Sequence, residues 1–212
     1  MQLDKLPIFP LQVVLYPGEV LPLHIFEDRF KDLIGDCIEQ DVPFGIVLFR
    51  EGKMEEMGCT ARVSKVTEEF EDGKKDIIVT GEERFRVSKV FRVHSYPTAD
   101  IEMVRDEHSP ADLKLVERVI AQHIKLLELA GRTPAPTMYQ ERDPLSFFIA
   151  HNSGLNLDQK QKVLELETES ARIAFLIEHL EQFIPAVEEA ESVRLKIKSN
   201  GHFKDFPPEV DN

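Results

Sequence analysis

Apolar residues in the first part of the chain fall in short runs that suit β-strands. Two runs, at residues 6–9 and 13–16, are bounded by prolines, which lack the N–H group that a central strand needs. The Pro17-Gly18 pair that follows predicts a turn. Apolar residues then recur at helical spacing over residues 27–40, which indicates an amphipathic helix. Residues 44–49 are apolar without alternation, so we expect a strand that is buried on both faces.

The next part of the chain predicts a small, mostly antiparallel barrel. Residues 50–58 are polar and bracketed by glycines, which favours a loop. An Asp72-Gly73 pair between two β-prone stretches predicts a hairpin. We expect the remaining strands at residues 60–66, 76–80, 84–93 and 99–104. Strands at such short spacing, with no long helix between them, are typical of a barrel or a folded sheet.

Near residue 109 the apolar period changes from two to about three and a half, which indicates helices. Gly131 is well placed to end the first of them, and Pro185 lies inside the last, where it predicts a kink. Residues that begin or cap helices predict four starts, at Ser109-Pro110, Asp143-Pro144, Asp158 with Gln161, and Thr168.

The change of period divides the chain into two parts and predicts an α+β fold. We expect a β-rich subdomain with one helix at residues 1–106 and a helical bundle at residues 107–200 that ends in a long kinked helix. Residues 201–212 are polar and predict a flexible tail.

The chain is acidic, with 39 Asp and Glu residues against 26 Lys and Arg residues and a formal net charge of -13. A surface of that sign repels a phosphate backbone, so we expect no nucleic-acid partner. The densest basic residues alternate with apolar ones, as on the solvent face of a strand: Arg84, Arg86, Lys89 and Arg92.

No run approaches the roughly 18–20 apolar residues of a membrane span, and the N-terminus lacks a signal-peptide pattern. We therefore expect a cytoplasmic protein without a membrane partner.

The motifs of common catalytic sites are missing from the sequence. It contains no GxxxxGK[ST], GxGxxG, HExxH or GxSxG pattern, and its adjacent carboxylates point apart on any strand or helix. We expect His24 to be a packed structural residue, and His123 and His151 to lie on helix surfaces or ends. Cys37 and Cys59 form no CxxC pair and predict buried thiols. The sequence thus predicts no enzyme, no catalytic or metal-binding residue and no cofactor, and a small-molecule site between the two halves stays an alternative.

Large apolar residues at expected turns and loops are the candidates for binding. Flexible thioethers and aromatic rings can accept many apolar segments without requiring one sequence. The same side chains can instead pack inward and cap the barrel, and this alternative stays open. The candidates are Tyr16, Val20, Met54, Met57 and Phe70.

Several stretches also resemble one known family. LPIFPLQVVLYPGEVLPLHIFEDRF at residues 6–30 is similar to the opening of the N-terminal domain of Lon proteases. FGIVLF, then GCTARVSKV and DIIVTGEERFRV, follow in the family's order, and RDPLSFFIAHNSGLNLDQKQKVLELETESARIAFLIEHL at residues 142–180 resembles the distal half of that domain. The resemblance implies a pseudobarrel similar to PUA domains and a role in substrate recognition. The ATPase and Ser-Lys protease modules of Lon have no counterpart here, so we expect a stand-alone recognition domain.

Two functions follow as hypotheses. The first is a non-enzymatic module that binds exposed hydrophobic or unfolded polypeptide segments, as the family resemblance implies. The second is an adaptor or oligomerisation domain whose helical half docks on a specific folded partner, such as a protease or chaperone.

Overall fold

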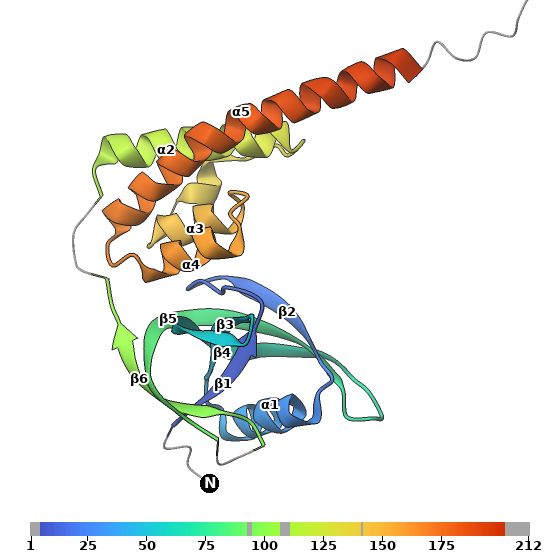
Figure 1. Ribbon diagram of the computed structural model, residues 1–212, viewed down its shortest axis with the longest axis vertical. Helices are drawn as coiled ribbons and strands as arrows, with labels where there is room; N and C mark the ends of the chain where they lie inside the picture. The colour runs from blue at the N-terminus through green and yellow to red at the C-terminus, as the bar shows by residue number, and fades with distance from the viewer. Residues whose placement is uncertain (1–4, 93–94, 107–110, 141, 202–212) are drawn as a thin grey trace, which may run out of the picture.

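The structure is a computed structural model that describes residues 5–92, 95–106, 111–140 and 142–201, with side chains up to residue 194. Its strands are β1 (Leu6–Leu11), β2 (Val20–Ile25), β3 (Phe44–Arg50), β4 (Lys53–Glu69), β5 (Lys75–Phe91) and β6 (Thr98–Val104). Its helices are α1 (Asp28–Gln40), α2 (Leu113–Leu129), the 3-10 helix η1 (Pro136–Tyr139), α3 (Leu145–His151), α4 (Leu157–Glu165) and α5 (Glu169–Gly201). The expected α+β order, a β-rich half with one helix and then a helical half, is confirmed (Figure 1).

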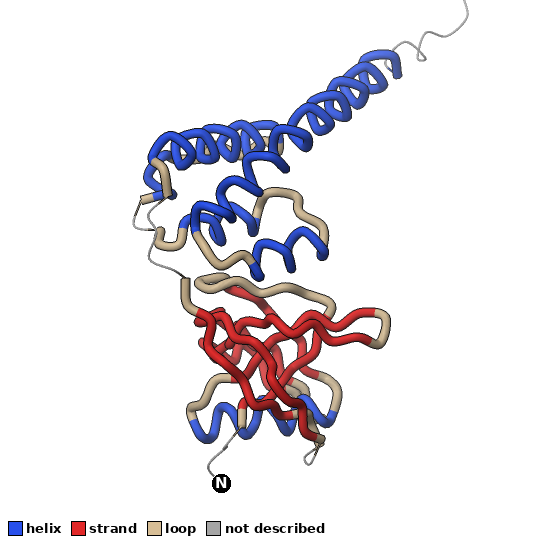
Figure 2. The backbone as a smooth tube through the Cα atoms, turned by 60° about the vertical axis from the view of Figure 1, so that its left-hand side comes forward, coloured by secondary structure: helices blue, strands red, loops and turns tan. Residues whose placement is uncertain are grey.

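The sheet closes into a ring. Its strand order is β2-β5-β4-β3-β1-β6, and β6 also pairs with β5, so that β5, β4, β3, β1 and β6 form a closed circuit. The pairings are antiparallel except that of β1 with β3, which confirms a mostly antiparallel barrel. β2 lies outside the circuit, beside the first part of β5. Figure 2 shows α1 at the end of the barrel away from the helical half.

The polar loop expected at residues 50–58 is wrong, because β4 already begins at Lys53. Glu51 and Gly52 both have positive φ, 51° and 79°, and together they make a tight turn between β3 and β4. Met54 then lies opposite Phe49 in the ladder. Gly52 was correctly taken to mark a change of chain direction, but it belongs to a two-residue turn and not to a long loop.

The strand expected at residues 13–16 is also wrong, because this segment has no assigned strand. Its side chains nevertheless alternate between two cores. Leu15 packs into the core between α1 and the sheet, whereas Val14 and Tyr16 pack into a second core that they share with the helices of the second half. The apolar run therefore reflects burial on both sides and not sheet pairing.

The helical half follows the expected order with changes at the caps. The side chain of Asp112 caps α2, and the Ser109-Pro110 start lies outside the described residues. Gly131 has a φ of 72° just after α2, as expected of a glycine that ends a helix. The capping box of α4 is formed by Asn156 with Gln159, so the assignment to Asp158 with Gln161 is wrong.

The last helix, α5, is continuous through Pro185, and a kink there stays a prediction. Its final turns extend away from the other helices in Figure 1. The boundary expected near residue 106 falls beside residues 107–110, which lie outside the described part of the chain, as do residues 202–212 of the expected tail.

Buried residues form three hydrophobic clusters. One lies between α1 and one face of the sheet, and a small one around Phe85 on the other face contains residues of β1, β3, β5 and β6. The largest joins the two halves: it contains Leu48 and Met57 from the sheet together with residues of α2, α3, α4 and α5. Cys37 and Cys59 are free and buried, as expected, and burial raises the pKa of the Cys37 thiol to about 12.

Candidate functional site

Two of the five candidate binding residues are inaccessible. Tyr16 and Met57 are each only 1% exposed, so the expectation that they form an open surface is wrong. The helical half covers both of them. The Tyr16 hydroxyl donates to the carbonyl of Lys160 over 3.0 Å, and the carbonyl of Met57 accepts from Gln161 over 3.1 Å. Burial raises the pKa of Tyr16, which keeps this hydroxyl protonated as a donor.

The other three candidates lie in different places. Val20, 57% exposed, borders the junction of the two halves. Met54 is half-buried against the small cluster around Phe85. Phe70 lies at the tip of the β4–β5 hairpin, and its ring contacts that of His24 edge-on at 6.1 Å. The structure therefore does not bring the five residues together into one patch.

A buried ionic network joins the sheet to the helices. Arg84, expected on a solvated strand face, is 3% exposed and donates to the carbonyls of Leu164 and Leu166 over 2.7 and 2.8 Å. The expectation for Arg84 is therefore wrong, because the helical half packs over this part of β5. Arg86, Lys89 and Arg92 are exposed, as expected.

Arg172 of α5 completes this network. It is fully buried and pairs with Asp106, as Arg84 does, and with Glu169 over 2.8 Å. It also donates to the hydroxyl of Ser146 over 2.7 Å. Each charge thus has an opposite charge or a hydrogen-bond partner, which fixes α3 and α5 against the sheet.

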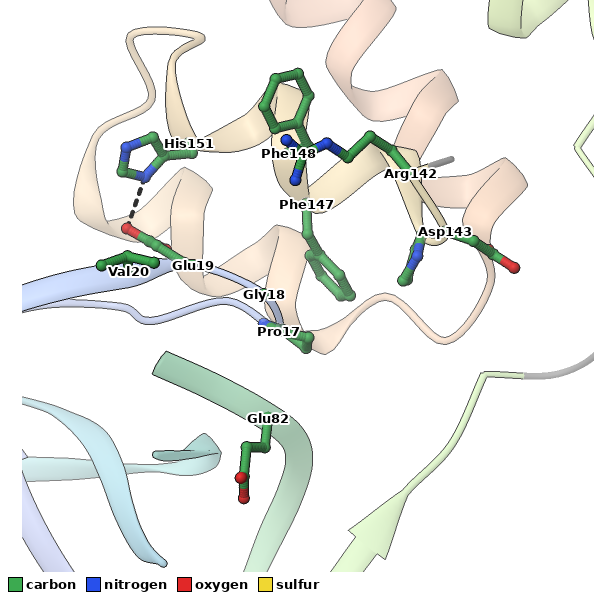
Figure 3. A pocket seen from close by; sticks show the side chains of 11 residues that line it. Pro17, Gly18, Glu19, Val20, Glu82, Arg142, Asp143, Phe147, Phe148 and His151 are labelled. Atoms are coloured by element: carbon green, nitrogen blue, oxygen red, sulfur yellow. Dashed lines mark hydrogen bonds and ion pairs between the residues drawn. The ribbon is translucent and has the colours of Figure 1, made fainter. Parts of the chain in front are cut away.

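Between the turn before β2 and helix α3 lies a pocket of about 500 Å³, which we call the junction pocket (Figure 3). Its apolar lining comes from both halves: Pro17, Val20, Pro144, Phe147 and Phe148. Phe147 is held from behind, since the Tyr16 ring stacks on it at 5.3 Å and the Arg172 guanidinium lies 4.4 Å from its ring centre. The pocket therefore has a rigid apolar floor.

Polar side chains complete the rim of the junction pocket. Glu19 pairs with His151 over 2.6 Å, which ties the turn to the end of α3 (Figure 3). The other carboxylate oxygen of Glu19 accepts the N–H of Tyr16 over 3.0 Å. Arg142 lies 4.5 Å from the ring centre of Phe148 and shields one side of that ring. His151 ends α3 and is exposed, as expected.

Phe148, Arg142 and Pro144 were not predicted as site residues. The only signal for them was the RDPLSFFIAH stretch, which could be placed on a helix but not opposite the Pro17-Gly18 turn. No group of three or more His, Cys, Asp or Glu side chains suited to a metal ion is found in the part of the chain that the structure describes. The pocket offers apolar contact and hydrogen bonds rather than an activated nucleophile.

Gly81 holds the turn that forms the pocket rim. Its N–H donates to the carbonyl of Glu19, and its carbonyl accepts from Gly18 over 2.8 Å. A Cβ added at Gly81 would lie 2.2 Å from the carbonyl oxygen of Tyr16. We therefore expect Gly81→Ala to lower the free energy of unfolding by about 1–3 kcal/mol, because the turn must move away from β5.

Urea unfolding followed by circular dichroism measures this effect. Gly35→Ala in α1 is the matched control, since no atom lies within 4 Å of its added Cβ. It should raise the free energy of unfolding by about 0.5–1 kcal/mol, because alanine favours helix. If Gly81→Ala were as stable as the unaltered chain, the tight contact between the turn and β5 would be disproved.

Comparison with known proteins identifies what the chain is similar to. Residues 5–182 match the family model of the ATP-dependent protease La (LON) substrate-binding domain. Lon protease of Cytophaga hutchinsonii is 25% identical over 92% of the chain, and Lon protease 2 of Myxococcus xanthus is 30% identical over 82%. The chain spans about a quarter of the length of these relatives, 26% and 23%.

Solved structures show the same fold. The crystal structure of the Lon N-terminal domain protein from Xanthomonas campestris superposes with a TM-score of 0.66, at 23% identity, over 82% of this chain and 98% of that one. The N-terminal domain of Mycobacterium avium complex Lon protease gives a TM-score of 0.61 at 18% identity, over 84% and 98%. Among the described residues, no helix has the length and apolar character needed to cross a membrane.

Proposed function

The chain belongs to the substrate-binding domain family of the ATP-dependent protease Lon, and from this we propose that it is a non-enzymatic module that recognises polypeptides. We propose that it binds exposed hydrophobic or unfolded segments, and that the junction pocket is where an apolar side chain of such a segment is held. The observation that carries the proposal is an open pocket with an apolar floor, formed by residues from both halves.

The composition of the pocket supports a broad preference for apolar segments. Val20 and Phe148 offer contact area without a fixed pattern of hydrogen bonds, so many side chains can fit. Three of the charged lining residues already have partners within the protein: Glu19 pairs with His151, Glu82 with Arg62, and Arg142 lies against the ring of Phe148. Asp143 adds a further carboxylate to the lining.

Substitution of Val20 tests the proposal. Val20 is 57% exposed, so Val20→Ser should change stability little but remove apolar contact from the pocket. We expect binding of an apolar peptide to weaken about five-fold, the equivalent of about 1 kcal/mol of lost apolar burial. The chain has no tryptophan, so the fluorescence of a single tryptophan in the peptide reports binding without background.

The control is Val193→Ser on α5, where the valine is 49% exposed and far from the pocket in sequence. This variant should bind the peptide as the unaltered chain does. A polar peptide of the same net charge provides the baseline. Equal weakening by both substitutions, or no binding above the polar peptide, would argue against the proposed site.

The end of α5 favours a second candidate function. Its described residues after Val187 are mostly exposed, including Val193 at 49%. A helix that extends beyond its own bundle can dock on a folded partner, which is the adaptor hypothesis. Co-purification from the native cell tells the two apart, since an adaptor brings one stoichiometric partner and a recognition module brings a mixed set.

A further inference from the structure

Strand β2 has a free edge. β5 is paired along one side with β4, and along the other side with β2 and then β6. Among the described strands, β2 pairs with β5 alone, and the backbone of residues 20–25 makes no hydrogen bond to other described backbone groups outside that pairing. The side of β2 that faces away from β5 therefore carries backbone groups without a protein partner.

The register shows which groups these are. The carbonyl of Glu19 accepts from Gly81 of β5, and residues two apart on a strand direct their backbone groups to the same side. The backbone N–H and C=O groups of Leu21 and Leu23 thus face β5, whereas the N–H groups of Val20 and His24 face outward. Pro22 has no N–H to lose, which fits the preference of proline for the outward side of an edge strand.

The other open edge near the hairpin is less suited to pairing. The outer part of β4, beyond its pairing with β3, has register shifts between Val63 and Lys65 and between Val66 and Glu68. Bulges and charged side chains are the usual means by which an edge avoids pairing. The described ladder of β2 with β5 shows no such shift, and Pro22 does not interrupt it because its backbone nitrogen faces outward.

Exposed side chains follow β2 on one face. Val20, Pro22 and His24 alternate with the more buried Leu21 and Leu23. The expectation that His24 is packed is therefore wrong: its side chain is 52% exposed, and its Nδ1 lies 2.5 Å from Asp76. Just beyond the strand, Phe26 is 57% exposed and stacks on His24 with ring centres 6.0 Å apart. Phe70 of the hairpin contacts the ring of His24 edge-on, with ring centres 6.1 Å apart.

The strand thus connects two apolar sites. Val20 at its beginning borders the junction pocket, and the aromatic group of His24, Phe26 and Phe70 lies at its end. Six residues of extended chain cover roughly 20 Å. In Figure 1, β2 runs from beneath the helical half toward the hairpin, so an extended segment could lie along it from one site to the other.

We propose that a bound polypeptide adds to the sheet as an extra strand along the outer edge of β2, with alternate apolar side chains directed toward the junction pocket and the aromatic group. This rests on the proposed function and specifies how the segment is held. Backbone hydrogen bonds give affinity that does not depend on sequence, and the alternate side chains add the preference for apolar residues.

Pro22 favours a peptide over a second copy of the chain as the occupant. In a symmetric antiparallel pair centred on β2, Pro22 of each copy would lie opposite the other, and neither could donate a hydrogen bond at the centre. A peptide strand meets only one missing donor, since it can still donate to the carbonyl of Pro22. The edge is thus weakened for self-pairing but not for a ligand.

N-methylated peptides test the mode of binding on the unaltered protein. The probe is an eight-residue peptide in which apolar residues, one of them tryptophan, alternate with serine. Two variants carry N-methyl groups on the even or on the odd positions, which removes the donors along one edge of the strand or the other. Strand addition predicts that one variant loses at least about ten-fold in affinity while the other binds as the parent does.

Each outcome decides a different point. Equal affinities of the two methylated peptides, both kept or both lost, would overturn strand addition, although the proposed function would stand if the parent peptide binds. No binding of the parent peptide would remove the proposed function as well. A dimer in sedimentation velocity that the peptide dissociates would make a second copy the occupant and would also overturn the inference.

A pair of substitutions at His24 gives an independent measurement. His24→Ala removes the side chain and keeps the outward N–H, whereas His24→Pro removes both. We expect the proline variant to bind the parent peptide about five-fold more weakly than the alanine variant, the equivalent of one hydrogen bond. Equal affinities of two folded variants would contradict a bond to this N–H, and if the proline variant does not fold, the methylated peptides still decide.

Discussion

Replacing Arg172 by methionine is expected to lower the free energy of unfolding by about 3–5 kcal/mol, because it leaves the carboxylate of Glu169 without its cation and that of Asp106 with Arg84 alone. Arg172 is fully buried, and its partners Asp106 and Glu169 have side chains only 27% and 18% exposed. Methionine keeps most of the aliphatic stem, so the loss reports the charge network rather than a cavity. Urea unfolding followed by circular dichroism measures it.

The control is an arginine whose ion pair is exposed. Arg118 of α2 pairs with Glu181 of α5, and the two side chains are 53% and 46% exposed. Arg118→Met should therefore cost less than about 1 kcal/mol. A similar cost for both substitutions would show that the buried network contributes no more than a surface ion pair.

Acid should destabilise the protein partly through His123. The residue was expected on a helix surface, but it is fully buried, and its imidazole Nδ1 lies 2.9 Å from the Tyr139 hydroxyl. Burial first, and the charge of Arg132 second, lower its pKa from 6.5 to about 4. Between these two values the unfolded chain takes up a proton that the folded chain does not, so the free energy of unfolding falls as the pH is lowered from about 6.5 to about 4.

The expected loss over this window is roughly 3 kcal/mol. His123→Gln keeps a polar group near Tyr139 but cannot titrate. The difference in unfolding free energy between the unaltered chain and this variant, measured in urea at several pH values, should therefore change across the window and stay constant above about pH 7. Carboxylates titrate in both proteins and cancel in the difference. If the unfolding free energies of the two proteins changed in parallel with pH, His123 would not contribute to the acid destabilisation.

The sequence was sufficient for the order of the elements because hydrophobic period and turn residues are local signals. The Asp72-Gly73 hairpin and the helix at residues 27–40 were predicted close to their observed positions. The strand expected at residues 13–16 failed for a non-local reason. An apolar run looks the same whether it pairs in a sheet or is covered from two sides, as Leu15 and Tyr16 are.

The site was predicted only in part, because exposure depends on how the two halves pack. Val20 was correctly expected at an accessible turn, but nothing local shows that α3 lies opposite. Arg84 alternates along β5 just as Arg86 does, yet only Arg84 is covered by helices. Tyr16 and Met57 were wrongly expected on the surface because the sequence does not show that the helical half covers them.

Because the two halves share one core, neither half is expected to be stable when expressed alone. Leu48, Met57 and Tyr16 are covered by helices, and those helices bury their own apolar faces against the same residues. A fragment that ends after the sheet would leave this surface in water and would be prone to aggregate, as would the helices expressed alone. Grafting the recognition surface onto another protein would therefore require both halves to be transferred together.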